Sequence, residues 1–212
     1  TCTQGALCAL AWGIRSSEAG HALVTKTLRV KRPHTMRVRF EGNLPTGVGA
    51  QDMILHLFSR HGATGGSGFA VEFAGPVVEA LEIEARMTLC NMAVEFSAFT
   101  GLIAPDEKTA AYLRGRPHAP QGEQWQQALS WWAQLRSDED AEFERELVVD
   151  CSDLQSQVTG GTSPEHAADI SAPVPLPVDE RGQLCPSRER ALEYTALRPG
   201  QALAGLPLDA AF

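Results

Sequence analysis

Long apolar runs are missing from this sequence. No stretch approaches the roughly 20 consecutive apolar residues that a membrane-spanning helix needs. The apolar stretch at residues 5–14 also lacks the basic segment that precedes the apolar region of a signal peptide. The sequence therefore predicts neither a signal peptide nor a membrane-spanning helix, and we expect no membrane among the partners of this chain.

Closely spaced pairs of cysteine or histidine are missing too. The five cysteines are Cys2, Cys8, Cys90, Cys151 and Cys185, and no two of them form a CxxC pair. An odd, scattered set predicts neither a disulfide framework nor a zinc site. We expect free thiols in a reducing cytoplasm, and the six histidines likewise lack the spacing of metal ligands.

An excess of basic charge is the third thing missing. The chain has 18 Lys and Arg residues against 26 Asp and Glu residues, a formal net charge of −8. Negative charge opposes nonspecific binding to nucleic acid, so we expect no nucleic-acid partner. The basic stretch at residues 26–39 could bind an anion, but a solvated linker between domains is the favoured interpretation.

Predicted helices and strands alternate along the chain, a pattern typical of α/β folds. Residues 36–40 alternate apolar and polar side chains, which predicts a half-buried strand. Candidate domain boundaries fall at residues 31–35 and 138–146. The predicted helices are 5–14, 16–24, 50–59, 84–99, 106–113 (capped by Asp106), 123–135 and 188–197. The predicted strands are 36–40, 69–73, 102–104, 146–149 and one that begins near residue 206, after a proline-rich extended connection at 172–186.

The polar residues Asn91 and Glu95 are the candidates for chemistry. On a helix over residues 84–99 they would be four positions apart and share one face. Their neighbours are apolar, and a buried carboxylate is costly unless it is paired or has a chemical role. The alternative is a solvent-facing pair on an amphipathic helix, and the residues alone favour that alternative.

Residues 62–68, with the sequence GATGGSG, suggest a phosphate-binding loop at first sight. The segment lacks the Lys-Ser/Thr ending and the preceding long strand of a P-loop. A tight turn with close backbone packing is therefore the favoured interpretation.

Three ordered segments resemble the aconitase superfamily, in particular its 3-isopropylmalate dehydratase large-subunit branch, with homoaconitase and aconitase as relatives. The first is TCTQGA with ALAWGI, at residues 1–14, followed by Ser17 and Glu18. The second joins GGSG at 65–68 and VEF at 71–73 to RMTLCNMAVE at 86–95. The third comprises APDE at 104–107, YLRGR at 112–116 and QVTGGTSP at 157–164.

The resemblance implies a three-layer αβα fold and an iron–sulfur hydro-lyase. It implies that residues 1–35 end a first domain, 36–137 form a compact second domain, and 138–212 connect to and begin a third. The reaction would be the isomerisation of 2- and 3-isopropylmalate by dehydration and rehydration, a step of leucine biosynthesis. The substrate would be a hydroxy-polycarboxylate, and a small subunit would complete the enzyme as a heterodimer. By the same resemblance Glu95 interacts with the hydroxyl or water on a [4Fe-4S] cluster, and Asn91 lies beside that cluster without being a ligand.

The resemblance also implies that this chain is an internal fragment. The family's D-S-H acid/base motif would come immediately before Thr1, and its first cluster cysteine would come directly after Phe212. None of the five cysteines present matches a cluster ligand. We therefore expect no metal ligand in this chain, and no cluster or activity when the chain is alone.

Several positions depart from the family pattern. The family has glycine where this chain has Cys8, Arg15, Ala85 and Ser97, and a glycine with positive φ cannot be replaced freely. In addition, Gly160 replaces a tryptophan and Gln4 a histidine. Two further readings therefore stand beside the hydro-lyase: a diverged, non-catalytic scaffold or subunit-binding module, and the homoaconitase or aconitase branch. RNA binding is a distant third in view of the charge.

Overall fold

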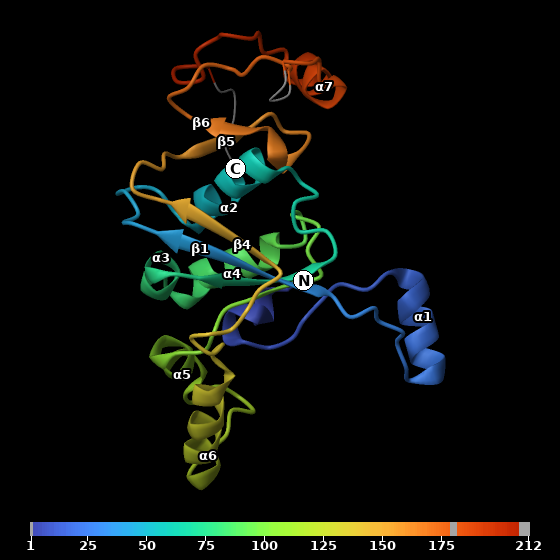
Figure 1. Ribbon diagram of the computed structural model, residues 1–212, viewed down its shortest axis with the longest axis vertical. Coiled ribbons are helices and arrows are strands. Elements are labelled where there is room, and N and C mark those ends of the chain that lie inside the picture. The colour runs from blue at the N-terminus through green and yellow to red at the C-terminus, as the bar shows by residue number, and fades with distance from the viewer. Residues whose placement is uncertain (1, 179–181, 208–212) are drawn as a thin grey trace.

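A four-stranded parallel sheet forms the centre of the molecule. The computed structural model describes residues 2–178 and 182–207 (Figure 1). The strands are β1 (His34–Glu41), β2 (Phe69–Ala74), β3 (Thr100–Leu102) and β4 (Arg145–Asp150), in the order β3-β2-β1-β4. The central strand β1 places Met36 opposite Val71 of β2 on one side and opposite Arg145 of β4 on the other.

Helices connect these parallel strands, so the α/β class expected from the sequence is confirmed. Helix α2 (Ala50–His61) links β1 to β2, and α3 (Pro76–Ala80) and α4 (Ile83–Met92) link β2 to β3. The connection from β3 to β4 contains α5 (Glu107–Leu113), α6 (Glu123–Trp132) and a short 3-10 segment, Ala133–Leu135. Helix α5 begins as predicted, because the side chain of Asp106 accepts a hydrogen bond from the backbone N–H of Thr109.

The hydrophobic core lies on one face of the sheet. Met36, Val38 and Phe40 of β1 are fully buried there, packed with the apolar stripe of α2 and with α4. The alternate residues Arg37 and Arg39 point to the opposite face, as the period of two requires. There the Arg37 guanidinium lies 3.9 Å from the ring centre of Phe143 and 3.4 Å from a carboxylate oxygen of Glu72.

The remaining elements lie at the two ends of the chain. A 3-10 helix, η1 (Thr3–Leu7), packs against α4 and β3, and α1 (Ser16–Thr25) stands away from the body with no buried residue (Figure 1). The C-terminal part contains a small hairpin of β5 (Gln157–Thr159) and β6 (Ala167–Asp169), the 3-10 helix η3 (Pro164–His166), and α7 (Pro186–Thr195). In the described ranges, no helix has the length and apolar character needed to cross a membrane.

The division into residues 1–35, 36–137 and 138–212 stays a prediction, and contacts link all three ranges. Strand β4 lies in the third range and pairs with β1 of the second. From the first range, Ala6 is buried in the common core, and the carbonyl of Gly5 accepts a hydrogen bond from the N–H of Ile103.

Several elements differ from the sequence prediction, and η3, β5 and β6 are among those it did not include. The helix expected at 5–14 is wrong: after η1, Cys8 adopts a left-handed φ of 58° and residues 9–15 are not helical. The helix expected at 84–99 ends at Met92 instead, and the strand expected at 102–104 is β3, two residues earlier. Helix α3 was not predicted. Of the strand expected near residue 206, residues 208–212 lie outside the described part of the chain.

Candidate functional site

Asn91 lies in the last turn of α4, with its side chain exposed. Its Oδ1 accepts a hydrogen bond of 3.3 Å from the hydroxyl of Thr3 in η1. Because η1 also packs against α4 through buried Cys2 and Ala6, this contact fixes the amide next to a well-anchored segment. The amide can present both a donor and an acceptor to a ligand.

Glu95 follows α4 in a turn that spans residues 93–97. Backbone bonds from Glu95 N–H to Met92 and from Ser97 N–H to Val94 replace the helical pattern, and Ser97 has a positive φ of 62°. The Glu95 side chain is exposed, and within the described residues it forms no hydrogen bond or ion pair. The prediction that Asn91 and Glu95 share one helix face is therefore wrong, although both lie at the C-terminal end of α4.

Phe96 explains why the helix ends before Glu95. Its ring is fully buried and stacks on Phe58 of α2, with 5.6 Å between ring centres. The backbone N–H of Gly66 donates a 2.9 Å hydrogen bond to the Phe96 carbonyl. A Cβ on Gly66 would lie 2.7 Å from the Phe96 ring, so only glycine fits there without displacing the ring.

The glycine-rich loop at 62–68 thus supports the turn that carries Glu95. The Ser97 hydroxyl donates a second bond, 2.9 Å long, to the carbonyl of Ala63 in the same loop. Close backbone packing was the favoured interpretation of this loop, and the structure confirms it.

The other end of α4 is held by Arg86, whose side chain is only 1% exposed. Its guanidinium donates to the carbonyls of Leu81 and Glu79 and pairs with Asp106 at 2.6 Å. Burial of Asp106 opposes ionisation, but the hydrogen bonds from Arg86 and Thr109 outweigh it and hold the pKa of that carboxyl below its usual range. A buried, fully bonded arginine therefore fixes the position of the helix that carries Asn91.

Three thiols gather where η1 meets α4. Burial raises the pKa of the fully buried Cys90 thiol, and the neighbouring Cys2 and Cys8 raise it further. Burial also raises the pKa of Cys8. The five cysteines are scattered in the sequence, whereas the fold brings these three near one another and favours the protonated forms of Cys90 and Cys8.

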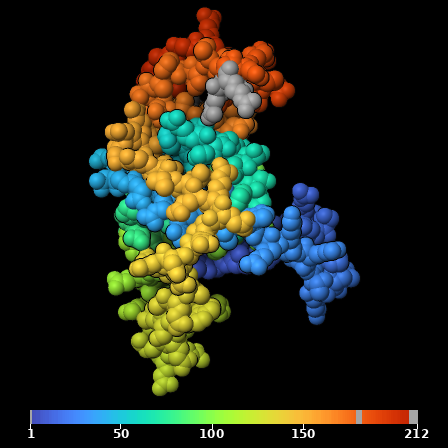
Figure 2. Space-filling view, in the orientation of Figure 1, coloured from blue at the N-terminus to red at the C-terminus, as the bar shows by residue number. Residues whose placement is uncertain are grey.

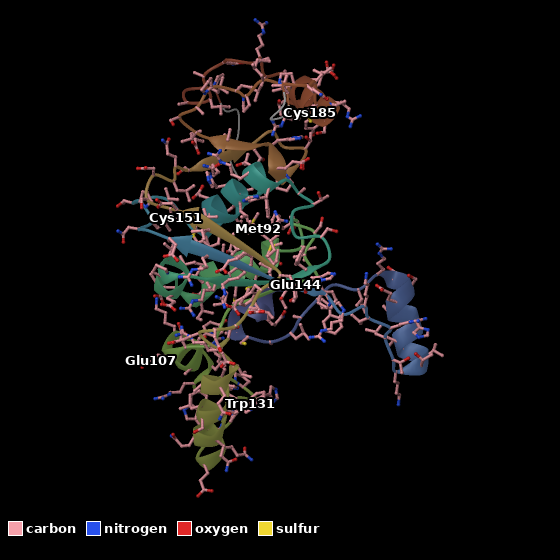
Figure 3. All side chains as sticks on the ribbon, viewed as in Figure 1. Met92, Glu107, Trp131, Glu144, Cys151 and Cys185 are labelled. Atoms are coloured by element: carbon pink, nitrogen blue, oxygen red, sulfur yellow. The ribbon has the colours of Figure 1, made fainter. Side chains whose placement is uncertain are left out.

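The described residues do not assemble the ligands of an iron–sulfur cluster. Within residues 2–178 and 182–207, no group of three or more His, Cys, Asp or Glu side chains is placed to hold a metal ion. Metal ligation also requires thiolates, which the raised pKa of Cys90 disfavours. Cys151 and Cys185 lie in other parts of the molecule, away from Met92 at the end of α4 (Figure 3).

The candidate site lies at the amino edge of the sheet. The turn at 93–97 leads directly into β3, and the glycine-rich loop leads into β2. Small ligands of open α/β sheets ordinarily bind at the opposite, carboxyl edge. Asn91 and Glu95 are thus presented by the end of a helix and a turn, facing outward from this chain.

Sequence reasoning missed the residues that hold this site in place. Thr3, Gly66 and Phe96 act through tertiary contacts that no periodicity reveals. A usable signal was present for Arg86, because an arginine between apolar helix neighbours requires buried partners. Whether Asn91 and Glu95 act in catalysis remains a prediction.

Comparison with known proteins identifies the family. The model described as aconitase family (aconitate hydratase) matches residues 1–212. The chain is also 49% identical over 217 aligned residues to a Bradyrhizobium diazoefficiens protein named 3-isopropylmalate dehydratase large subunit 1. That match covers 100% of this chain and 45% of the relative, so the chain spans about half the length of the curated relative. With the family model matched along its whole length, this chain belongs to the aconitase family.

Proposed function

We propose that this chain is part of a hydro-lyase that interconverts 2- and 3-isopropylmalate by dehydration and rehydration. The observation that carries the proposal is the Glu95 carboxylate, which is exposed and unpaired among the described residues, in the turn that directly follows the helix carrying Asn91. The 49% identity to a protein named as the large subunit of this dehydratase supports the same reaction and favours it over the homoaconitase branch.

In this proposal Glu95 and Asn91 act on the substrate's hydroxyl. Dehydration removes a proton from one carbon and a hydroxyl from its neighbour, which leaves a double bond. Rehydration adds water back with the hydroxyl on the carbon that had lost the proton. The carboxylate of Glu95 accepts a hydrogen bond from the hydroxyl or the released water and positions it. The Asn91 amide, held by Thr3, orients the same group by hydrogen bonding.

The rest of the active site would come from outside this chain. Family membership supports a [4Fe-4S] cluster in the complete parent protein, where it would supply Lewis-acid chemistry and be held by ligands from other segments of that protein. The outward-facing position of Asn91 and Glu95 at the amino edge of the sheet is consistent with other segments completing the site. A small-subunit partner, a hydroxy-polycarboxylate substrate and a cytoplasmic location belong to the same proposal.

The test is Glu95→Gln in the complete parent protein with its small subunit. Loss of the carboxylate should lower kcat by roughly 100-fold, because the hydroxyl or the released water is no longer held in position. Because the Glu95 side chain has no partner among the described residues, the thermal unfolding midpoint should not change. Glu84→Gln is the matched control, since Glu84 is an exposed carboxylate in the first turn of α4, away from the turn that carries Glu95.

Asn91→Asp and Asn91→Ala extend the test to the amide. Both should lower kcat, and Asn91→Ala should also lose the contact with Thr3. If Glu95→Gln and Glu84→Gln have equal turnover, Glu95 has no catalytic role. A parent protein that is inactive before any substitution would instead support the non-catalytic scaffold.

A further inference from the structure

The charges of this chain are strongly segregated. Residues 1–40 contain seven basic residues and one acidic residue, for a net charge of +6. Residues 41–212 contain eleven basic and twenty-five acidic residues, for a net charge of −14. The net charge of −8 is therefore the sum of a positively charged N-terminal segment, residues 1–40, and a strongly acidic remainder, residues 41–212.

Most of the positive charge lies on residues 26–33, here called the basic arm. Lys26, Arg29, Lys31 and Arg32 are all exposed, and none forms an ion pair with any described residue. Together with α1, the arm projects from the body of the molecule (Figures 1 and 2). Unpaired cations on a projecting segment favour contact with an acidic surface.

The basic arm and the end of α1 before it also expose apolar side chains. Leu23 and Val24 at the end of α1 are 83% and 84% exposed, and Val30 within the arm is 45% exposed. The arm therefore suits a partner that combines carboxylates with exposed apolar groups.

Residues 138–144, here called the acidic run, have that combination. Asp138, Glu139, Asp140 and Glu142 are exposed and have no ion-pair partner in the described part of the chain. The run follows α6 and its 3-10 extension, which leave Trp131 60% and Leu135 36% exposed. Four unpaired carboxylates thus match the four unpaired cations of the arm.

The arm and the run start from one point at the amino edge of the sheet. The arm leads into β1 and the run into the neighbouring parallel strand β4. At their junction His34 Nδ1 lies 2.5 Å from a carboxylate oxygen of Glu144 (labelled in Figure 3). Beyond the junction the two segments diverge, the arm toward α1 and the run toward α6 (Figure 1).

From this arrangement we propose that the basic arm docks on the acidic run of a second copy of the chain. Divergence within one chain keeps the arm from its own run. Because both segments leave from a single junction, two copies related by a two-fold axis form the contact twice, arm to run and run to arm. The inner side of the arm, including Arg29 and Arg32, lines an open groove of about 600 Å³ opposite Val94 and Ser97, which leaves room for an extended segment.

Self-association of this kind depends on salt. The contacts are exposed, and the range of charge interactions falls from about 10 Å at 0.1 M salt to about 3 Å at 1 M. Sedimentation velocity in 50 mM NaCl should show a species of twice the chain mass of 22.8 kDa. In 1 M NaCl the chain should sediment as a monomer.

Charge reversal tests which segments meet. Each exposed ion pair changes a dissociation constant by roughly two- to fivefold. Arg29→Glu with Lys31→Glu alters two pairs in each of two contacts, which should weaken the dimer by roughly 100-fold. Asp138→Lys with Asp140→Lys should do the same. Arg190→Glu with Arg198→Glu is the control for the same charge change, because both residues are exposed at the other end of the chain and dimerisation should persist.

Mixing the two reversed variants is the decisive experiment. Each alone should be largely monomeric, because the two reversed positions repel the native charges opposite them and the altered segment has no net charge left to attract its partner. In a mixed dimer, the reversed arm of one meets the reversed run of the other, and the two native segments meet as well, so the dimer should reappear at 50 mM NaCl. A mixture that stays monomeric overturns the proposal, and so does a wild-type chain that is monomeric at low salt. Dehydratase activity enters none of these measurements, so they stand apart from the proposed function.

Discussion

Cys8 and Ser97 hold a backbone conformation that glycine adopts more readily. Their φ angles are 58° and 62°, in the left-handed region where a Cβ crowds the backbone. Both are positions where the family resemblance led us to expect glycine, and the structure supplies the reason. Ser97 offsets part of the cost through its hydrogen bond to Ala63.

Cys8→Gly should therefore stabilise the chain. Removing the Cβ relieves about 1 kcal/mol of left-handed strain, and the thiol itself makes no hydrogen bond among the described residues that would be lost. Urea unfolding followed by circular dichroism should show a higher midpoint. Cys8→Ala keeps the strain and should give no gain; equal midpoints for the two variants would exclude backbone strain as the cause.

The thiols should differ in reactivity because their environments differ. The hydroxyl of Ser187, 3.3 Å from the Cys185 sulfur, and the backbone N–H of Arg188 lower the pKa of Cys185. Burial raises the pKa of Cys90. Since the thiolate reacts, Cys185 should be alkylated fastest and Cys90 slowest at pH 7.5.

Iodoacetamide labelling of the native chain, read by peptide mass spectrometry against time, gives the five rates. In Ser187→Ala the thiolate loses a donor, so the midpoint of the Cys185 rate against pH should move upward while the rate at high pH stays the same. An unchanged midpoint would show that Ser187 does not stabilise the thiolate.

At the scale of elements, the glycine-rich loop and the turn after α4 form one unit. In Gly66→Ala the new Cβ would lie 2.7 Å from the Phe96 ring and 3.0 Å from its carbonyl oxygen. Because Phe96 is fully buried against Phe58, it cannot move freely, and the substitution should destabilise the chain by about 1–3 kcal/mol.

Two comparisons isolate that clash. Gly20→Ala in α1 meets nothing within 4 Å and should leave stability unchanged or slightly higher. Phe96→Leu should cost less in the Gly66→Ala background than in the wild-type chain, because the smaller side chain makes room for the Cβ. Fully additive costs would argue against contact between residues 66 and 96.

The sequence predicts a helix or strand correctly where the residues within that element determine it. The prediction fails where contacts with distant residues determine the end of an element. Strand β1 follows from its alternation, α2 from its apolar stripe, and the start of α5 from the Asp106 cap. The end of α4 depends instead on Phe96 entering the core. The packing of η1 against β3 depends on Gly5, where a Cβ would overlap the carbonyl oxygen of Gly101.

The candidate site shows the same division. Asn91 and Glu95 were singled out by the resemblance, whereas the residues alone favoured a solvent-facing pair, and both side chains are exposed. Exposure is the outcome expected of a surface pair and also of a site completed by other segments. Local sequence therefore cannot distinguish them, because the deciding contacts would be made by groups outside this chain.

At the scale of the whole molecule, the chain combines a well-packed core with unpartnered surfaces. The sheet, α2 and α4 bury their apolar faces, whereas α1 has no buried residue and α6 buries only Trp125. The chain spans 45% of the relative it matches. A core that fixes Asn91 and Glu95 while leaving such surfaces free suits a part that functions within a larger assembly.

The last prediction concerns the 212-residue chain by itself, which should bind no [4Fe-4S] cluster and hydrate no substrate. Cluster binding needs several thiolates converging on one site. Cys2, Cys8 and Cys90 do approach one another, but burial raises the pKa of Cys90 and Cys8, and protonated thiols do not ligate iron. Cys151 and Cys185 lie elsewhere in the fold (Figure 3).

Anaerobic reconstitution with iron and sulfide, followed by desalting, should leave no stoichiometric visible chromophore and no hydration of the dehydrated substrate. The reconstituted parent protein with its small subunit is the positive control. A chromophore that persists in the chain but disappears in Cys90→Ala would show that the three thiols at η1 form a metal site after all.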